Sequence, residues 1–141
     1  MSRQISVIIV DNARKHFIKD AILSTLNQSL SRDQYEILEE SFANQGISFI
    51  NINATNGGEL YAKGIKESNG EILVFLDDDD MFDYHKLEHI NYVFQEYREL
   101  GYHHHTVRII DEFGNPISND KKNQYIKFAN KNFFYNDKLY A

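Results

Sequence analysis

The strongest candidates for chemistry in this sequence are four consecutive aspartates, Asp77, Asp78, Asp79 and Asp80. They follow residues 71–76, in which Ile, Leu, Val and Phe predict a buried strand. The strand would therefore place its carboxylates at the carboxyl edge of a sheet, where open α/β sheets bind ligands. Adjacent carboxylates repel one another, and a cation among them offsets that repulsion. Because all the ligand atoms would be oxygens, the cluster favours Mg²⁺ or Mn²⁺.

The acidic run could also be a capping turn or a calcium loop. A solvated acidic turn could cap the next helix, because carboxylates stabilise the amino end of a helix. A calcium loop would place Asp77, Asp79 and Glu88 at its first, third and twelfth positions. Met81 and Phe82 would then occupy positions that need an oxygen ligand and a glycine, and a strand rather than a helix precedes them. We therefore reject the calcium loop and keep the capping turn as the alternative.

The elements that must position these carboxylates follow from the spacing of apolar residues. Residues 5–10 and 47–52 have the composition of strands, and the first is suited to burial on both faces. Helical spacing predicts helices over 15–28 and 59–67, and a third helix that ends at Gly101. The third helix is marked by Leu87, Ile90, Val93, Phe94, Tyr97 and Leu100. Strands that alternate with helices predict an α/β sandwich, with a mostly parallel sheet flanked by helices.

Two regions depart from a regular alternation of elements. Residues 35–37 begin like a second strand, but 38–42 have helical spacing, so the strand is expected to be cut short. Either this element is lost, or residues are missing from the sequence at that junction. Further on, residues 106–111 alternate again, and 112–115 predict a hairpin turn. Beyond Asn119 we predict no regular element.

Composition limits the classes of function. The chain has 141 residues, which fits one domain over 1–141. Its formal net charge of -6, with scattered basic residues, predicts that nucleic acid is not a partner. Without cysteines the chain has no disulfides, thiolate metal sites or cysteine nucleophiles. Its apolar runs are too short for a transmembrane segment and its start does not resemble a signal peptide, so we expect a cytoplasmic chain.

Three segments in their order along the chain resemble the family-2 glycosyltransferases, whose fold is a nucleotide-binding α/β sandwich of the GT-A type. Residues 7–14 match the end of a strand with a short polar loop, and residues 57–65 match a glycine-led helix. Residues 70–80 match a strand that ends in an Asp-x-Asp motif. The resemblance covers roughly the first hundred residues and weakens afterwards. It implies that 1–100 form the nucleotide-sugar-binding half and that 101–141 form part of the acceptor side.

The resemblance also implies a chemistry for the acidic run. The donor would be a sugar linked to UDP or GDP, and an inverting transfer would depend on Mg²⁺ or Mn²⁺. Asp77 would meet the ribose of the donor, with Asp78 beside it in the nucleotide-sugar site. Asp79 would hold the metal ion, and Asp80 is the alternative ligand. The ion would neutralise charge that builds on the departing nucleoside diphosphate.

The acceptor is not identified by the resemblance. It would be a sugar or a lipid-linked molecule, and membrane association through segments further downstream stays open. An inverting transferase also needs a general base for the acceptor hydroxyl. After the third helix the remaining acids stand in no recognisable motif, so we assign no base: Asp111, Glu112, Asp120 and Asp137. We expect the first two of these acids to open the hairpin turn.

Several residues outside the acidic run modify this hypothesis. Asp11 and Arg14 in the first loop are candidates for donor binding, although Arg14 is equally an exposed arginine at a helix start. Tyr61 stands where relatives often carry an arginine, and the second strand lacks the acidic segment that contacts the base in relatives. The missing general base and the shortened second strand favour, as the alternative, a catalytically degenerate module that binds nucleotide or metal. A nucleotidyltransferase would need a glycine-rich loop after the first strand, and residues 11–13 do not supply one. The histidines at 103–105 would face opposite sides of a strand, so we do not expect them to share a metal ion.

Overall fold

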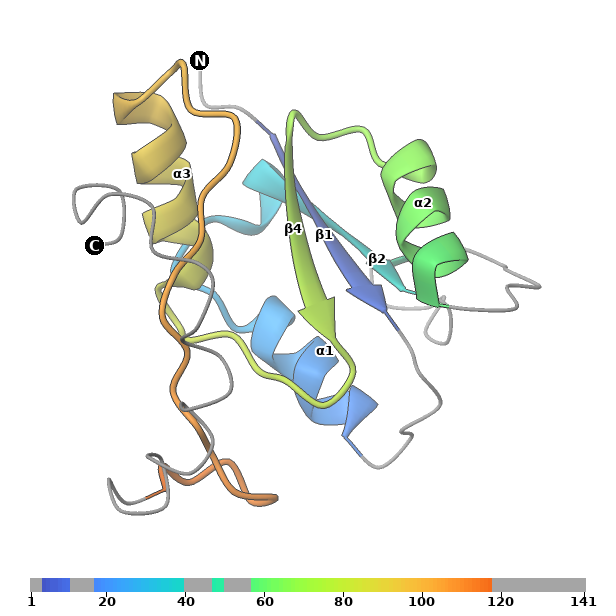
Figure 1. The fold of residues 1–141 in the computed structure, drawn as a ribbon, viewed down its shortest axis with the longest axis vertical. Coiled ribbons are helices and arrows are strands. Elements are labelled where there is room, and N and C mark those ends of the chain that lie inside the picture. Colours follow the sequence, from blue (N-terminus) through green and yellow to red (C-terminus); the bar gives the residue numbers. More distant parts are fainter. Residues whose placement is uncertain (1–3, 11–16, 40–46, 50–56, 118–141) are drawn as a thin grey trace. The chain divides into compact units, whose positions relative to one another are not determined.

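The structure is a computed structural model that describes residues 4–10, 17–39, 47–49 and 57–117. Contacts divide the chain into two compact units, Met1–Arg98 and Glu99–Ala141. Every helix and strand of the described residues lies in the first unit (Figure 1). Among the helices of the described residues, none is long and apolar enough to cross a membrane.

One sheet contains four parallel strands, β1 (Ile5–Val10), β2 (Tyr35–Glu39), β3 (Ile47–Phe49) and β4 (Ile72–Asp77). Their order in the sheet is β3-β2-β1-β4. β1 lies between two neighbours and is buried along its whole length, as its β-branched run predicts. Parallel strands are joined by crossover connections, and α-helices lie between β1 and β2 and between β3 and β4 along the chain (Figure 1). The predicted α/β fold with a parallel sheet is therefore confirmed.

The prediction of a shortened second strand is wrong. β2 has five residues and runs through Leu38 to Glu39, into the segment predicted as helix. Its register places Val7 of β1 beside Ile37, and Ile8 beside Leu38. The helical spacing after Ile37 is misleading because Leu38 is 2% exposed and packs with Ile8. Burial against a neighbouring strand outweighs the local pattern at this position.

Within the described ranges, three α-helices flank the sheet: α1 (Ile18–Leu26), α2 (Gly57–Glu67) and α3 (Lys86–Glu96). A short 3-10 helix, η1 (Arg32–Gln34), precedes β2. All three α-helices match predicted ones, but their limits differ. α1 ends before the predicted residue 28, and its predicted start at 15 lies outside the described residues. α2 begins at Gly57 rather than at 59. α3 ends at Glu96 rather than at Gly101, because Tyr97 is 52% exposed and does not extend the buried stripe.

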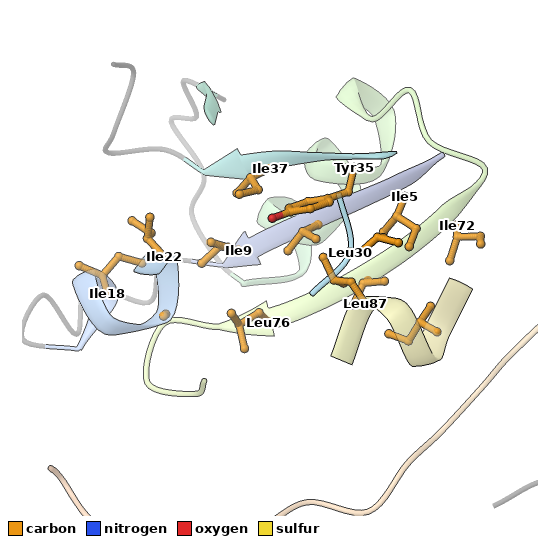
Figure 2. Close-up of a cluster of buried hydrophobic side chains, with 14 residues drawn as sticks. Ile5, Ile9, Ile18, Ile22, Leu30, Tyr35, Ile37, Ile72, Leu76 and Leu87 are labelled. Atoms are coloured by element: carbon orange, nitrogen blue, oxygen red, sulfur yellow. The ribbon is translucent and has the colours of Figure 1, made fainter. Parts of the chain in front are cut away.

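Alternation of side chains along the strands divides the core between the two faces of the sheet. On one face, α1 and α3 cover the larger cluster of buried side chains (Figure 2). Its members are Ile5, Val7, Ile9, Ile18, Ala21, Ile22, Leu30, Tyr35, Ile37, Ile72, Val74, Leu76, Leu87 and Ile90. The hydroxyl of Tyr35 also donates a hydrogen bond of 2.8 Å to the carbonyl oxygen of Thr25. That bond connects β2 to the end of α1.

The other face of the sheet is covered by α2. The buried side chains on this face are those of Ile8, Val10 and Leu38. The partly buried side chains of Leu60, Tyr61 and Leu73 pack against them. Gly64 lies where α2 meets β1, and a Cβ atom there would lie 2.5 Å from Cγ2 of Ile8. The lack of a side chain at residue 64 therefore allows the helix to approach the strand closely.

Polar groups connect the strands at the amino edge of the sheet. The Ser6 hydroxyl donates to Oε1 of Glu36 at 2.5 Å and accepts from the backbone N–H of Gly70 at 2.7 Å. The backbone N–H of Asn69 donates to the same Glu36 oxygen at 2.7 Å. Burial alone would raise the pKa of Glu36, but hydrogen bonds from Asn69, Ser6 and Gly70 outweigh it and hold this pKa below its ordinary value. These bonds fix the start of β4, the strand that carries the aspartates.

The described part of the second unit, residues 99–117, contains the predicted turn. Ile110 and Pro116 form an antiparallel bridge, and Gly114 has a φ of 83°, which favours glycine. The backbone N–H of Gly114 donates to the carbonyl oxygen of Asp111 at 3.0 Å. The predicted turn is confirmed, whereas residues 106–109 do not form a strand within this described segment.

The close approach of α2 to β1 gives a prediction of stability. Gly64→Ala should lower the free energy of unfolding by about 1–3 kcal/mol, because the added methyl group overpacks against Ile8. Urea denaturation of both proteins measures the change. Gly101→Ala is the matched control, since a Cβ atom there would have no other atom within 4 Å. Equal stability of the Gly64 variant and the wild type would contradict the packing described for this face.

Candidate functional site

The acidic run lies at the carboxyl edge of the sheet. β1 and β4 pair in parallel with Val10 beside Asp77, so the two strands end together. Asp77 is the last residue of β4. The backbone N–H of Asp80 donates to the carbonyl oxygen of Asp77 at 3.1 Å, so residues 77–80 form a turn directly after the strand. The predicted placement of the aspartates, at the edge where α/β sheets bind ligands, is confirmed.

Three of the four carboxylates converge. One carboxylate oxygen from each of Asp77, Asp79 and Asp80 lies within 4.8 Å of the other two. Asp79 and Asp80 are exposed, and Asp77 is half-buried. Among the described residues this is the one group of three or more His, Cys, Asp or Glu side chains that could hold a metal ion. The histidines at 103–105 are not part of such a group. Three carboxylates offer oxygen ligands alone, and that donor set fits Mg²⁺ or Mn²⁺.

Asp78 differs from its three neighbours because its side chain has no exposed surface. Every buried side-chain nitrogen and oxygen atom of the described residues has a hydrogen-bond partner, so the Asp78 carboxylate is satisfied within the protein. A ligand would reach this carboxylate only if the turn moved. The place of Asp78 in the donor site therefore stays a prediction.

Tyr61 of α2 contacts the acidic cluster directly. Its hydroxyl donates a hydrogen bond of 2.7 Å to Oδ1 of Asp77. Its ring packs edge-to-face on Phe75, with centroids 5.3 Å apart and planes at 73°. Sequence reasoning treated Tyr61 only as a replaced arginine and missed this contact. The available signal was the alternation of β4, which places Leu73, Phe75 and Asp77 on one face of the sheet.

The end of α1 holds the segment that follows the acidic turn. The Ser24 hydroxyl accepts a hydrogen bond of 3.0 Å from the backbone N–H of Phe82. Nε2 of Gln28 donates to the carbonyl oxygen of Asp83 at 2.9 Å, and its Oε1 accepts from the backbone N–H of Leu87 at 3.0 Å. Leu87 lies in the first turn of α3, whose own N-cap residue makes no side-chain capping bond within the described structure. Gln28, which lies just after the end of α1, therefore caps α3 from a distant part of the sequence.

These contacts bear on the two alternatives for the acidic run. α3 begins at Lys86, well beyond Asp80, and receives its cap from Gln28, so the aspartates do not act as its capping residues. Glu88 would be the last ligand of a calcium loop. Its Oε2 instead accepts from the Ser29 hydroxyl at 2.9 Å and lies 2.9 Å from Nδ1 of His85. The contacts with His85 and Ser29 lower the pKa of Glu88. The rejection of a calcium loop agrees with this geometry.

The remaining candidates fall into two groups. Four of them lie outside the described residues: Asp11, Arg14, Asp120 and Asp137. Asp111 is described, and its Oδ1 accepts hydrogen bonds from the backbone N–H groups of Asn115 at 2.8 Å and Phe113 at 2.9 Å. These hydrogen bonds hold the pKa of Asp111 below its ordinary value, and the bond from the backbone of Asn115 has the largest effect. Asp111 therefore stabilises the turn, as predicted.

The chain belongs to glycosyl transferase family 2, whose family model matches residues 6–140. Two similar solved structures are of TarS from S. aureus. The crystal structure of S. aureus TarS is 20% identical, with a TM-score of 0.55, over 67% of this chain and 20% of that one. The crystal structure of S. aureus TarS 1-349 in complex with UDP is 18% identical, with a TM-score of 0.56, over 67% of this chain and 33% of that one.

The structural likeness confirms the predicted GT-A fold. This chain spans 20% and 33% of the lengths of the two TarS chains. No curated protein matches the sequence.

The cap that Gln28 supplies to α3 gives a prediction for the support of the acidic turn. Gln28→Leu should lower the free energy of unfolding by about 1–3 kcal/mol, because the N–H of Leu87 and the carbonyl of Asp83 both lose a partner. Urea denaturation measures the loss. Gln95→Leu is the control, since Gln95 is exposed and bonds only within α3, to Asn91 at 3.2 Å. A loss no larger in the Gln28 variant than in this control would show that the contacts of Gln28 with Asp83 and Leu87 contribute nothing to stability.

Proposed function

We propose that this chain carries the donor-binding site of a glycosyltransferase, and that Asp77, Asp79 and Asp80 form the divalent-cation site of that donor. The observation that carries the proposal is the convergence of these three carboxylates in a chain of glycosyl transferase family 2. The donor is a nucleoside diphosphate sugar. UDP is the first nucleotide to test, because one of the similar structures is a complex with UDP. GDP is the second.

Charge explains why this donor needs a cation. The diphosphate and the three converging carboxylates are all negative, so they repel one another unless a cation lies between them. Asp79 and Asp80 would hold Mg²⁺ or Mn²⁺ together with one oxygen of Asp77, and the bound ion would stabilise the negative charge of the departing nucleoside diphosphate. The remaining lone pairs of the half-buried Asp77 carboxylate would accept hydrogen bonds from the ribose hydroxyls. Asp78, which belongs to the same turn, is a further candidate for the nucleotide-sugar site.

The first loop completes the donor site in this proposal. The sequence continues from Val10, at the end of β1 and beside Asp77, into Asp11 and on to Arg14. Residues after neighbouring strand ends lie at the ligand-binding edge of such a sheet. A guanidinium group recognises phosphate with two parallel hydrogen bonds, which suits Arg14 to the diphosphate.

The length of β2 weakens one argument for a degenerate module. The strand extends past Ile37 to an acidic residue, Glu39, where the sequence predicted an earlier end. The other argument, the lack of an assigned general base, is supported by the use of the Asp111 carboxylate within its turn. A module that binds the donor without transferring its sugar is therefore the second candidate function.

The acceptor side of the reaction follows from the same family resemblance. Transfer with inversion needs a general base near the acceptor hydroxyl. We assign 1–100 to the donor half and 101–141 to part of the acceptor side. The acceptor is a sugar or a lipid-linked molecule, and its class is to be found by assay of the longer protein if this chain is a piece of one.

Calorimetric titration with UDP and GDP, each with and without Mn²⁺, tests the donor site. We expect one nucleotide to bind in the presence of Mn²⁺. Asp79→Asn should weaken that binding about tenfold or more, because it removes one of the carboxylate ligands while it preserves the shape of the side chain. Asp20→Asn is the control, since Asp20 is an exposed carboxylate in α1.

Two outcomes would contradict parts of this proposal. Binding that is equal with and without Mn²⁺, or equal in the two aspartate variants, would remove the cation from the site. Metal-dependent binding without sugar transfer or donor hydrolysis would favour the degenerate module over the enzyme.

A further inference from the structure

The converging carboxylates of Asp77, Asp79 and Asp80 repel one another, and this repulsion favours conformations that separate them. At a distance below 4.8 Å, two carboxylate charges repel even in a solvent-exposed site. A side chain at the end of a strand can rotate about χ1 and χ2 to relieve such repulsion. A group that holds the carboxylate toward its neighbours would therefore prepare the cluster for a cation.

Tyr61 is in a position to hold Asp77 in this way. The phenol hydroxyl donates to Oδ1 of Asp77 at 2.7 Å, the length of a strong hydrogen bond to a charged acceptor. A carboxylate has about four lone-pair sites, so one donated bond leaves the others for a cation or a hydroxyl group.

The ring of Tyr61 is itself fixed. It packs edge-to-face on Phe75, two residues before Asp77 on the same strand, with centroids 5.3 Å apart. It also packs against the buried cluster of Ile8, Val10 and Leu38 on the α2 face of the sheet. The hydroxyl is therefore presented to Asp77 by a side chain with little rotational freedom, so the bond costs little additional entropy.

The charge of the donor group matters as much as its position. A lysine or arginine paired with Asp77 would neutralise that carboxylate and reduce the attraction of the cluster for a divalent cation. A phenol hydroxyl is neutral at pH 7 and leaves the negative charge in place. Tyr61 thus orients the carboxylate and preserves its charge at the same time.

We propose that Tyr61 is a positioning residue that holds the Asp77 carboxylate in the conformation that binds Mn²⁺ or Mg²⁺ together with Asp79 and Asp80. This inference rests on the proposed cation site and assigns the residue that prepares it. The aromatic pair of Tyr61 and Phe75 couples α2 to β4, so the position of this helix on the sheet sets the geometry of the cluster.

The test uses Tyr61→Phe, which removes one oxygen atom and keeps the ring packed on Phe75. The affinity for Mn²⁺ alone is measured from the electron paramagnetic resonance signal of free Mn²⁺, which also follows weak binding. We expect affinity to fall about tenfold, the lower end of the effect of residues that orient metal ligands. The urea concentration at the midpoint of unfolding should change in Tyr61→Phe by no more than it does for a substitution on the protein surface. Tyr92→Phe is the matched control, because Tyr92 is 59% exposed on α3.

A second variant separates positioning from direct ligation. If Tyr61 acts through Asp77, adding Tyr61→Phe to Asp77→Asn should cause no further loss of Mn²⁺ affinity. An equal loss in both backgrounds would show that Tyr61 acts on the ion independently and would overturn the positioning role. Wild-type affinity in Tyr61→Phe, with normal metal binding by the wild type, would overturn this inference alone. A wild type that binds neither Mn²⁺ nor nucleotide would overturn the proposed function and this inference with it.

Discussion

The parallel pairing of β1 with β4 is the constraint on which the rest of this structure depends. The two strands match over six residues, from Ile5 beside Ile72 to Val10 beside Asp77. This register ends both strands at one edge and turns the chain into the acidic run there. It also fixes which side chains face which helices, so that a shift by one residue would exchange the two faces of β4 and carry Asp77 away from Tyr61. The core and the candidate site therefore share one structural cause.

Helices on both faces of the sheet contribute to the same edge. α2 reaches the cluster through the Tyr61 hydroxyl. Ser24, near the end of α1, and Gln28, just after that helix, hold the segment that follows the turn. The polar contacts of Glu36 at the opposite edge fix the start of β4. A flexible acidic loop would separate its charges, whereas these supports keep three carboxylates close. These supports from both faces of the sheet are consistent with the cation site that we propose for the three carboxylates.

The sequence was sufficient for those features that depend on local patterns. The strand before Asp77 was evident from its β-branched and aromatic residues, and the turn around Gly114 from its turn-forming composition. It was insufficient where tertiary contacts override a local pattern. Leu38 belongs to an apparent helical stripe, yet it pairs beside Ile8 in the sheet. Tyr61 contacts Asp77, which is 16 positions away, and Gln28 contacts Leu87, which is 59 positions away. The periodicity of apolar residues carries no information on such pairs.

The central claim is that Asp77, Asp79 and Asp80 together bind the cation that carries the donor diphosphate. A crystal structure with Mn²⁺ and UDP, using the anomalous signal of manganese, tests it most directly. We predict one manganese peak within coordination distance of carboxylate oxygens of Asp77, Asp79 and Asp80, in contact with the diphosphate, with the Tyr61 to Asp77 hydrogen bond intact. A nucleotide bound elsewhere, or a manganese peak away from these three carboxylates, would contradict the account.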